Sequence, residues 1–302
     1  MSTFSKKILI TGASGFTGFH ACQHFLKAGY EVTAIVRNHP LDLPIHIEKC
    51  DLSNYDSVLK LIKKVKPEFV LHLAGQNHVG NSWKDPVGTI NDNFISTLHL
   101  VEAMRTEVPL CNAVIVGSAL EFTPSNPYSL PHPYSFSKTI QILVAKAWAV
   151  LFNLNIKIAK PTNLIGPGVS NGVCSVFSKK IVEMENDETD RTLEVNNLKT
   201  RRDFIDVRDA VKAYELILTT GESNEVYEVN TGKLYTLEDI VLILKNLTPI
   251  QFECKELGFD ITNKESELMS SNEKLKKLGW KPTIQLEESL QDILNFHRNI
   301  NV

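Results

Sequence analysis

Lys7-Ile8-Leu9-Ile10-Thr11-Gly12-Ala13-Ser14-Gly15-Phe16-Thr17-Gly18 is the stretch that decides the fold of this chain. A short apolar strand leads into three spaced glycines, and a helix is predicted over residues 16–28. Glycine allows a tight turn and a close approach of the backbone to a pyrophosphate. The N–H groups of a helix's first turn attract phosphate. The stretch therefore predicts a dinucleotide site, with contacts from Gly12, Gly15, Phe16, Thr17 and Gly18.

Strands and helices alternate outward from this turn. Strands are predicted at residues 31–36, 45–49, 69–73, 113–116 and 156–159, with helices between them that include 89–105 and 134–152. Such alternation implies right-handed crossovers and a parallel sheet covered on both faces. We therefore expect an α/β fold with a Rossmann-like, doubly wound parallel sheet.

The rhythm changes after Pro161, where a loop rich in Gly, Pro and Asn begins. Shorter elements follow, so a smaller, discontinuous C-terminal lobe is expected to bind substrate. The predicted dinucleotide-binding domain comprises residues 1–161 and about 204–230. The predicted substrate-binding lobe comprises about 162–203 and 231–302.

Composition narrows the class of protein. The chain has 302 residues and a formal net charge of −3, which gives no reason to expect nucleic acid or an anionic membrane as partner. No apolar run approaches the roughly 20 residues that span a bilayer, and no signal-peptide pattern precedes the first strand. Five scattered cysteines without a Cys-x-x-Cys pair are typical of a reducing cytoplasm. His20 and His24 have no evident third ligand, so no metal site is predicted.

The ends of the later strands predict the rest of the dinucleotide site, because ligands collect at the carboxyl ends of parallel strands. The second strand ends in Arg37 with no carboxylate, which favours NADP(H) and leaves NAD(H) open. Asp51 and Leu52 follow the third strand as candidate adenine contacts; Asp51 could equally belong to the start of the next helix. Further candidate cofactor contacts at strand ends are Leu73, Ala74, Gly75 and Pro161, and Gln76 is a candidate substrate contact.

Tyr134-Ser-Phe-Ser-Lys138 places a tyrosine and a lysine one helical turn apart. A free tyrosine has a pKa of about 10, and a neighbouring ammonium stabilises its phenolate. Tyr134 can then exchange a proton with a carbinol or ketone oxygen, with Lys138 beside it and beside the cofactor. Ser118, at the end of the fifth strand, is the candidate that holds the substrate oxygen. Taken alone, the Tyr–Lys pair could also be an ordinary helix start; Ser118 and the glycine turn favour the catalytic interpretation.

These motifs together resemble the extended short-chain dehydrogenase/reductase family, specifically its nucleotide-sugar group, also called the NAD-dependent epimerase/dehydratase family. Residues 11–18 are similar to its Thr-Gly-x-x-Gly-x-x-Gly, and Ser118, Tyr134 and Lys138 to its catalytic residues. Asn93 matches an asparagine tied to active-site structure. Residues 160–168 resemble the family's Arg-Pro-x-Asn-x-Tyr-Gly-Pro-Gly, which implies that Asn163 contacts the substrate.

Residues 197–210 are similar to the matching segment of GDP-4-keto-6-deoxymannose reductases within this family. The resemblance implies that Arg202 contacts a diphosphate. Lys179, or its neighbour Lys180, on the preceding helix is a further candidate for the nucleotide. Arg202 and its neighbouring arginines could instead pair with nearby aspartates. The resemblance to this family also implies a homodimer through the helices at 89–105 and 134–152.

Departures from the family pattern narrow the expected reaction. Family 4,6-dehydratases carry a glutamate two residues after the catalytic serine or threonine, where this chain has Leu120; Glu121 lies one step further on. We therefore expect a reductase or oxidase at carbon 4 of a nucleotide-linked (6-deoxy)hexose. A 4-epimerase is the alternative, followed by a dehydratase and a non-catalytic dinucleotide-binding regulator. The nucleotide is left open among GDP, UDP and dTDP.

Overall fold

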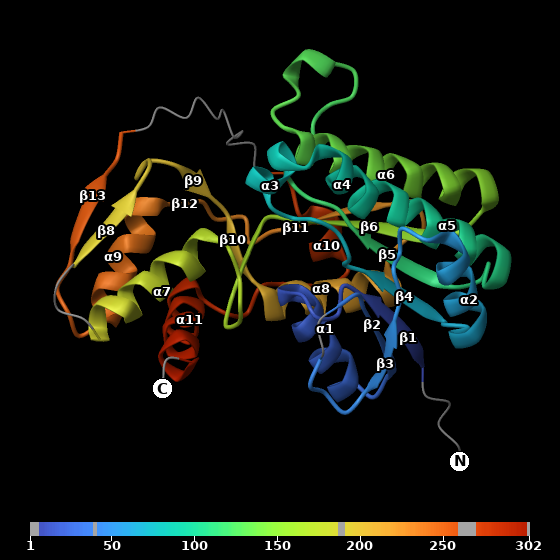
Figure 1. Cartoon of the computed structure of the whole chain (residues 1–302), viewed down its shortest axis with the longest axis horizontal. Helices are drawn as coiled ribbons and strands as arrows, with labels where there is room; N and C mark the ends of the chain where they lie inside the picture. The colour runs from blue at the N-terminus through green and yellow to red at the C-terminus, as the bar shows by residue number, and fades with distance from the viewer. Residues whose placement is uncertain (1–5, 39–40, 187–190, 259–269, 301–302) are drawn as a thin grey trace. The chain divides into compact units, whose positions relative to one another are not determined.

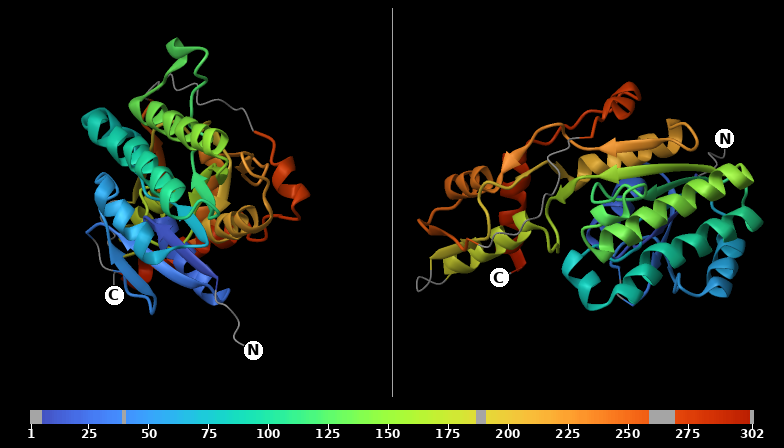
Figure 2. Two further views of the ribbon diagram at one scale, coloured as in Figure 1. Left: turned by 90° about the vertical axis from the view of Figure 1, so that its right-hand side faces the viewer. Right: turned by 90° about the horizontal axis from the view of Figure 1, so that it is seen from above.

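The computed structural model describes residues 6–38, 41–186, 191–258 and 270–300 (Figures 1 and 2). The chain forms two compact units. The first comprises Met1–Pro161, Val211–Val229 and Lys274–Trp280, and the second Thr162–Ala210, Asn230–Glu273 and Lys281–Val302. These bounds differ from the predicted domains mainly at two segments: residues 204–210 lie with the second unit, and Lys274–Trp280 with the first.

The first unit is built on a seven-stranded sheet in the order β11-β6-β5-β4-β1-β2-β3, in which every neighbouring pair is parallel (Figure 1). The order reverses direction beside β1, which is the topological switch point of a doubly wound sheet. The predicted Rossmann-like fold is confirmed. The strands are β1 (Lys7–Thr11), β2 (Glu31–Val36), β3 (His46–Lys49), β4 (Phe69–His72), β5 (Asn112–Val116), β6 (Asn155–Pro161) and β11 (Val226–Val229).

Helices cover the sheet on both faces. On one face α5 (Ser96–Glu107) packs between α2 (Tyr55–Val65) and α6 (Pro133–Phe152), and all three bury apolar side chains in one core (Figures 1 and 2). α1 (Phe16–Lys27) and α8 (Val207–Thr220) are joined by His24 Nε2 and Glu215 Oε2, 2.6 Å apart. Shorter helices are α3 (Val79–Lys84), α4 (Pro86–Ile90) and α10 (Glu273–Lys277), with a 3₁₀ turn at Pro127–Ser129.

One helix that the sequence predicts as continuous, at 89–105, has a different construction. α4 passes into a π-helical turn, Asn91–Ile95, before α5 begins. π turns widen the backbone by one residue and are common at functional sites. This turn carries Asp92 and Asn93, both of which take part in the site described below.

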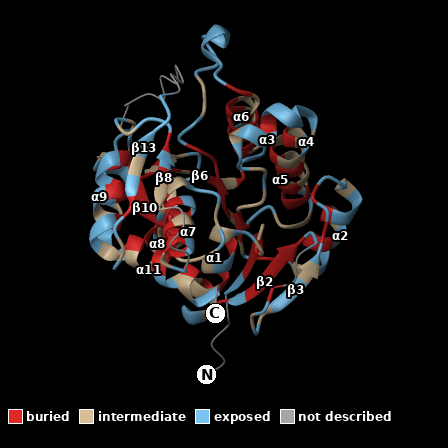
Figure 3. Ribbon diagram, turned by 60° about the vertical axis from the view of Figure 1, so that its left-hand side comes forward, coloured by how far each residue is buried: buried red, intermediate tan, exposed pale blue. Residues whose placement is uncertain are grey.

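Burial follows the pattern expected for a parallel sheet. β2 is buried along all but its first residue, whereas edge strand β3 is mostly exposed (Figure 3). Parallel strands that are covered on both faces are apolar throughout. The polar residues needed for chemistry therefore lie at the strands' ends rather than along them.

The second unit has its own core, formed by α7 (Val173–Asn186), α9 (Leu237–Leu247) and α11 (Leu286–Ile300). The strands among its described residues form three two-stranded pairs. β7 (Asn163–Ile165) pairs with β10 (Phe204–Asp206), β8 (Thr192–Val195) with β13 (Glu253–Glu256), and β9 (Arg201–Arg202) with β12 (Tyr235–Thr236).

Candidate active site

The turn after β1 leaves no room for side chains at two of its glycines. Gly12 has a φ of +66°, and a Cβ there would lie 2.8 Å from the backbone nitrogen of Ala74. A Cβ at Gly18 would overlap the carbonyl oxygen of Gly12. The start of α1 is thereby held close against β1, with the N–H groups of its first turn directed at the mouth of the sheet. This cradle fits the pyrophosphate of a dinucleotide.

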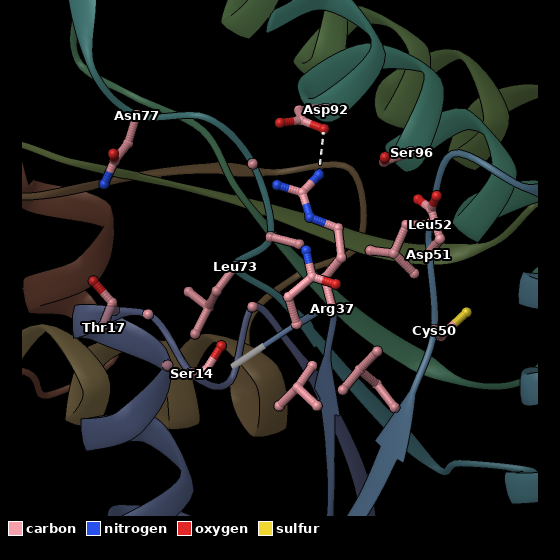
Figure 4. A pocket seen from close by; sticks show the side chains of 18 of the residues that line it. Ser14, Thr17, Arg37, Cys50, Asp51, Leu52, Leu73, Asn77, Asp92 and Ser96 are labelled. Atoms are coloured by element: carbon pink, nitrogen blue, oxygen red, sulfur yellow. Dashed lines mark hydrogen bonds and ion pairs between the residues drawn. The ribbon is translucent and has the colours of Figure 1, made fainter. Parts of the chain in front are cut away.

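A pocket of about 320 Å³ opens at this end of the first unit (Figure 4). Of the predicted cofactor contacts, all but Tyr134, Lys138 and Pro161 line it. Sequence reasoning did not single out the other lining residues, which are Ser14, Ile35, Val36, Asn38, Cys50, Asn77, Asp92 and Ser96. Asn38 directly follows Arg37 and could have been found from the strand end. Asp92 and Ser96 come from a helical segment, where no strand-end rule applies.

At the predicted adenosine end of the pocket a cation is paired with one carboxylate, and a second carboxylate lines the same pocket. Arg37 Nη1 donates to Asp92 Oδ1 at 2.9 Å, as the dashed line in Figure 4 marks. Asp51 accepts from the backbone N–H of Ser53 at 3.0 Å and from its hydroxyl at 2.8 Å. These bonds to Ser53, with the charge of Arg37 adding to them, hold the pKa of Asp51 below its usual value. Asp51 thus lines the pocket and also organises the turn before α2.

Tyr134 and Ser118 meet in the first unit. His132 caps α6 by accepting the Ser135 N–H on its Nδ1 at 2.9 Å, and Pro133 starts the helix, which places Tyr134 in the first turn. Ser118 follows β5 and is buried. Burial raises the pKa of Tyr134, and a hydrogen bond with Ser118 offsets part of this. Tyr134 is therefore a protonated phenol at neutral pH.

Lys138 is buried one helical turn later. Its ammonium donates to the Val116 carbonyl at 3.2 Å and to Gln141 Oε1 at 2.9 Å. Burial lowers the pKa of Lys138 to about 8. A Cβ at Gly75 would lie 3.8 Å from Lys138 Nζ, so the loop after β4 passes next to the ammonium. The expected electrostatic effect of Lys138 on Tyr134 is not among the causes of the Tyr134 pKa shift; burial and Ser118 are.

A chain of buried polar groups extends from Lys138 to the glycine-rich turn. Gln141 Nε2 donates to Thr97 Oγ1 at 3.0 Å, Thr97 Oγ1 lies 2.8 Å from His72 Nε2, and His72 Nδ1 lies 2.8 Å from Thr11 Oγ1. Because the Thr97 hydroxyl donates to the carbonyl of Asn93, His72 Nε2 must carry the proton that Thr97 accepts. Burial, with the charge of Lys138, lowers the pKa of His72 to about 3. His72 is therefore a neutral link.

Asn93 ties the π turn to this centre. Its Oδ1 accepts from the Gln76 N–H at 2.8 Å, and its Nδ2 donates to the Gln76 carbonyl at 3.0 Å and to Ser137 Oγ at 2.8 Å. Ser137 in turn donates to the Tyr134 carbonyl at 2.8 Å. The Gln76 side chain donates to the His78 carbonyl at 2.9 Å and to Thr89 Oγ1 at 3.2 Å.

Glu121 is engaged in an ion pair. Its carboxylate pairs with Lys160 Nζ on β6, which also lies 3.4 Å from Glu228 Oε1 on β11. Lys160 occupies the position of the family's arginine, and its side chain is only 14% exposed. Leu120, at the position of the dehydratase glutamate, has no ionisable group. The acid that elimination requires is therefore absent at that position. The next carboxylate along the chain, that of Glu121, is ion-paired with Lys160.

The remaining predicted substrate contacts lie in the second unit. Asn163 begins β7 and donates from Nδ2 to the Asp203 carbonyl at 3.0 Å. Arg202 lies in β9. Lys179 lies on α7 with 62% of its side chain exposed, 3.9 Å from Glu183. Of the neighbouring arginines, Arg208 pairs with Asp206, as the alternative interpretation of this segment expected, and also with the distant Asp292.

The described part of the chain has neither a candidate metal site nor a candidate membrane-spanning helix. No group of three or more His, Cys, Asp or Glu side chains there could hold a metal ion. No helix among the described residues is both long and apolar enough to cross a membrane.

Comparison with known proteins gives matches over nearly the whole chain. The profile of the NAD dependent epimerase/dehydratase family matches residues 8–230. The GDP-6-deoxy-D-mannose reductase of Pseudomonas aeruginosa is 29% identical, with 96% of this chain and 97% of that protein covered. A putative UDP-glucose 4-epimerase of Methanocaldococcus jannaschii is 26% identical, with 97% and 99% covered. The structure of RMD from Pseudomonas aeruginosa complexed with NADPH has a TM-score of 0.82 at 26% identity, covering 98% of this chain and 100% of that one.

Proposed function

This chain belongs to the NAD-dependent epimerase/dehydratase family, and from that premise we propose that it uses NAD(P)H to reduce carbon 4 of a nucleotide-linked 4-keto-6-deoxyhexose. The 29% identical relative is a reductase of a nucleotide-linked 6-deoxy sugar. The glycine turn and the pocket support the proposed dinucleotide site, and the Ser118–Tyr134 hydrogen bond supports Tyr134 as the proposed proton donor.

The 29% identical reductase relative carries the choice of reduction. Burial raises the pKa of Tyr134, so its hydroxyl holds a proton at neutral pH. A protonated phenol can donate its proton to a ketone oxygen during reduction. Ser118 positions that oxygen, and the bound nicotinamide supplies the hydride. Lys138, held by Val116 and Gln141, would contact the nicotinamide ribose.

Five residues are proposed as substrate contacts. We propose Asn163, Arg202 and Lys179 for the nucleotide end, and Gln76 and Ser118 for the sugar. An arginine suits bidentate recognition of a diphosphate. GDP, UDP and dTDP remain candidates for the nucleotide.

A 4-epimerase is the second candidate, favoured by the 26% identical relative described as a putative UDP-glucose 4-epimerase. Both reactions use the same tyrosine, so stoichiometry separates them. A reductase consumes one NAD(P)H for each product formed, and an epimerase turns over without net consumption. A 4,6-dehydratase is disfavoured by Leu120 and by the pairing of Glu121 with Lys160. A non-catalytic regulator is disfavoured by the intact Ser118, Tyr134 and Lys138.

The assay that tests this proposal follows NADPH and NADH oxidation with GDP-, UDP- and dTDP-4-keto-6-deoxyhexoses. Tyr134→Phe removes the donated proton, and general-acid catalysis typically contributes about 10²–10⁴-fold. We expect kcat to fall by that range while dinucleotide binding persists. Tyr128→Phe is the matched control, because Tyr128 is fully exposed. A Tyr134→Phe protein as active as the wild type would refute the catalytic assignment.

Three further properties belong to the same proposal. Arg37 favours NADP(H), with NAD(H) still open. The five free cysteines, four of them buried, suit a cytoplasmic protein. We also propose a homodimer formed through the α4–α5 segment and α6.

A further inference from the structure

We infer that Asp92 sets the selectivity of the dinucleotide site between NADP(H) and NAD(H). It does so by neutralising Arg37 and by repelling a 2′-phosphate. The inference rests on the proposed function, because it concerns the dinucleotide of that same site. It assigns a role to a residue that the strand-end pattern of the sequence does not reveal.

The strand that normally reads the adenosine ribose carries a cation alone. A carboxylate at the end of the second strand of such folds accepts from a 2′-hydroxyl, and a nearby arginine accommodates a 2′-phosphate. β2 ends in Val36 and is followed by Arg37 and Asn38. Judged by this strand end, the site would select NADP(H).

The missing carboxylate is supplied by another element. Asp92 lies 55 residues further along the chain, in the π turn between α4 and α5, and its Oδ1 is 2.9 Å from Arg37 Nη1. Both residues line the same pocket, and Figure 4 shows the Asp92 carboxylate facing the Arg37 guanidinium. The cation that would bind a 2′-phosphate therefore already has a counterion.

The two partners are held differently. The Arg37 side chain is 61% exposed, whereas that of Asp92 is 30% exposed. The backbone of Asp92 belongs to the turn that its neighbour Asn93 fixes to Gln76 and Ser137. Arg37 is thus free to turn toward a phosphate, while the carboxylate of Asp92 keeps its place beside it. An exposed ion pair is weak, so Arg37 can exchange partners readily.

The charge of Asp92 remains after that exchange. A phosphate monoester carries about −1.5 to −2 charges at neutral pH, and a fixed carboxylate beside it opposes its binding. The 2′-hydroxyl of NAD(H) is uncharged and suffers no such repulsion. Among the described residues that line the pocket, Asp51 is the other acidic one, and its carboxylate accepts from the backbone and hydroxyl of Ser53. Asp92 is the carboxylate that is hydrogen-bonded to Arg37, so we assign the discrimination between the two dinucleotides to its charge.

Asp92→Asn tests this directly, because it removes the charge and keeps an oxygen that can accept from Arg37. We measure the dissociation constants of NADPH and NADH by nicotinamide fluorescence on the full chain. We expect NADPH to bind about 3- to 10-fold more tightly to the variant, and NADH to stay within about 2-fold. The gain for NADPH should shrink at high salt, since salt screens exposed charges.

Glu31→Gln is the matched control. It also removes one negative charge, but at the amino end of β2, roughly 20 Å away by strand length. It should leave both dissociation constants unchanged. Arg37→Met should weaken NADPH while leaving NADH nearly unaltered, which checks that the 2′-phosphate is bound at this end of the pocket.

The outcomes separate a failure of the selectivity inference from a failure of the proposed reductase function. If Asp92→Asn shifts both dinucleotides equally, or weakens NADPH, the selectivity role of Asp92 is wrong while the reductase proposal stands. If the wild-type chain binds neither NADPH nor NADH, the proposed function itself fails. A several-fold gain for NADPH alone supports the inference.

Discussion

At the scale of single residues, the spacing of Tyr134 and Lys138 identifies the chemistry but not the contacts that tune it. Lys138 donates to Val116 and Gln141, and the pKa of Tyr134 is governed by burial and Ser118. Gln141 lies three residues after Lys138 on the same helix face, so its contact could have been predicted from i,i+3 spacing. His72 could not, because its partners Thr11 and Thr97 come from distant parts of the chain.

His72 should make the fold acid-sensitive in a defined window. Its pKa is about 3 in the folded chain and about 6.5 when unfolded. Between those values the unfolded chain binds a proton that the folded chain refuses, so the free energy of unfolding falls as pH falls. The expected slope is about 1.4 kcal/mol per pH unit below 6.5.

Urea unfolding of wild type and His72→Gln at pH 6.5 and pH 5 measures this contribution. Glutamine does not titrate, so the wild type should lose about 2 kcal/mol more than the variant over this interval, whatever the variant loses at neutral pH. Equal slopes for wild type and His72→Gln would show that the buried histidine is not the acid-sensitive group.

At the scale of elements, the sequence predicts the sheet better than the segment that completes the site. The apolar runs at 31–36 and 69–73 coincide with strands to within a residue, because buried parallel strands are continuously apolar. The helix predicted at 89–105 is instead α4, a π turn and α5. The spacing of apolar residues along a helix does not reveal a single turn that contains one extra residue. The π turn is stabilised by the tertiary bonds of Asn93, which local sequence does not show.

Asn93→Ala tests whether the π turn serves catalysis. The variant loses the bonds to Gln76 and Ser137, which hold the turn against the start of α6. We expect kcat to fall by about 10- to 100-fold, because small displacements of catalytic groups are costly. The dissociation constant of NADPH should change much less. Steady-state kinetics and fluorescence titration measure the two quantities.

Asn91→Ala is the control for Asn93→Ala, since Asn91 lies in the same turn and its exposed side chain makes none of these bonds. It should retain wild-type kcat. Circular dichroism verifies that both variants are folded. An Asn93→Ala protein with unchanged kcat would show that the hydrogen bonds of Asn93 are not needed to position the catalytic groups.

At the scale of the whole molecule, the two units differ in how much of each the sequence reveals. The sheet of the first unit follows from alternating strands and helices. The second unit's strands are two to four residues long, and β13 pairs with β8 some 60 residues earlier. Such short strands carry too little periodicity to be recognised. The predicted substrate contacts in this unit accordingly stay predictions.

The proposed homodimer would cover exposed apolar side chains on α6. Leu143 and Val150 on α6 are 48% and 69% exposed, and their seven-residue spacing places them on one helix face. Apolar helix faces of this kind associate with another helix in preference to water. Because α6 also carries Tyr134 and Lys138, association through this face would brace the catalytic helix.

Leu143→Glu should therefore convert a dimer into a monomer, because a buried unpaired charge opposes association. Sedimentation equilibrium should give about twice the 33.9 kDa chain mass for the wild type and the chain mass for the variant. Leu110→Glu is the control: Leu110 is 90% exposed but lies beyond the end of α5, so this variant should sediment as wild type. A monomeric wild type, or a Leu143→Glu protein that is still dimeric, would remove α6 from the proposed interface. The positions of Tyr134 and Lys138 would then depend on the hydrogen bonds within the first unit alone.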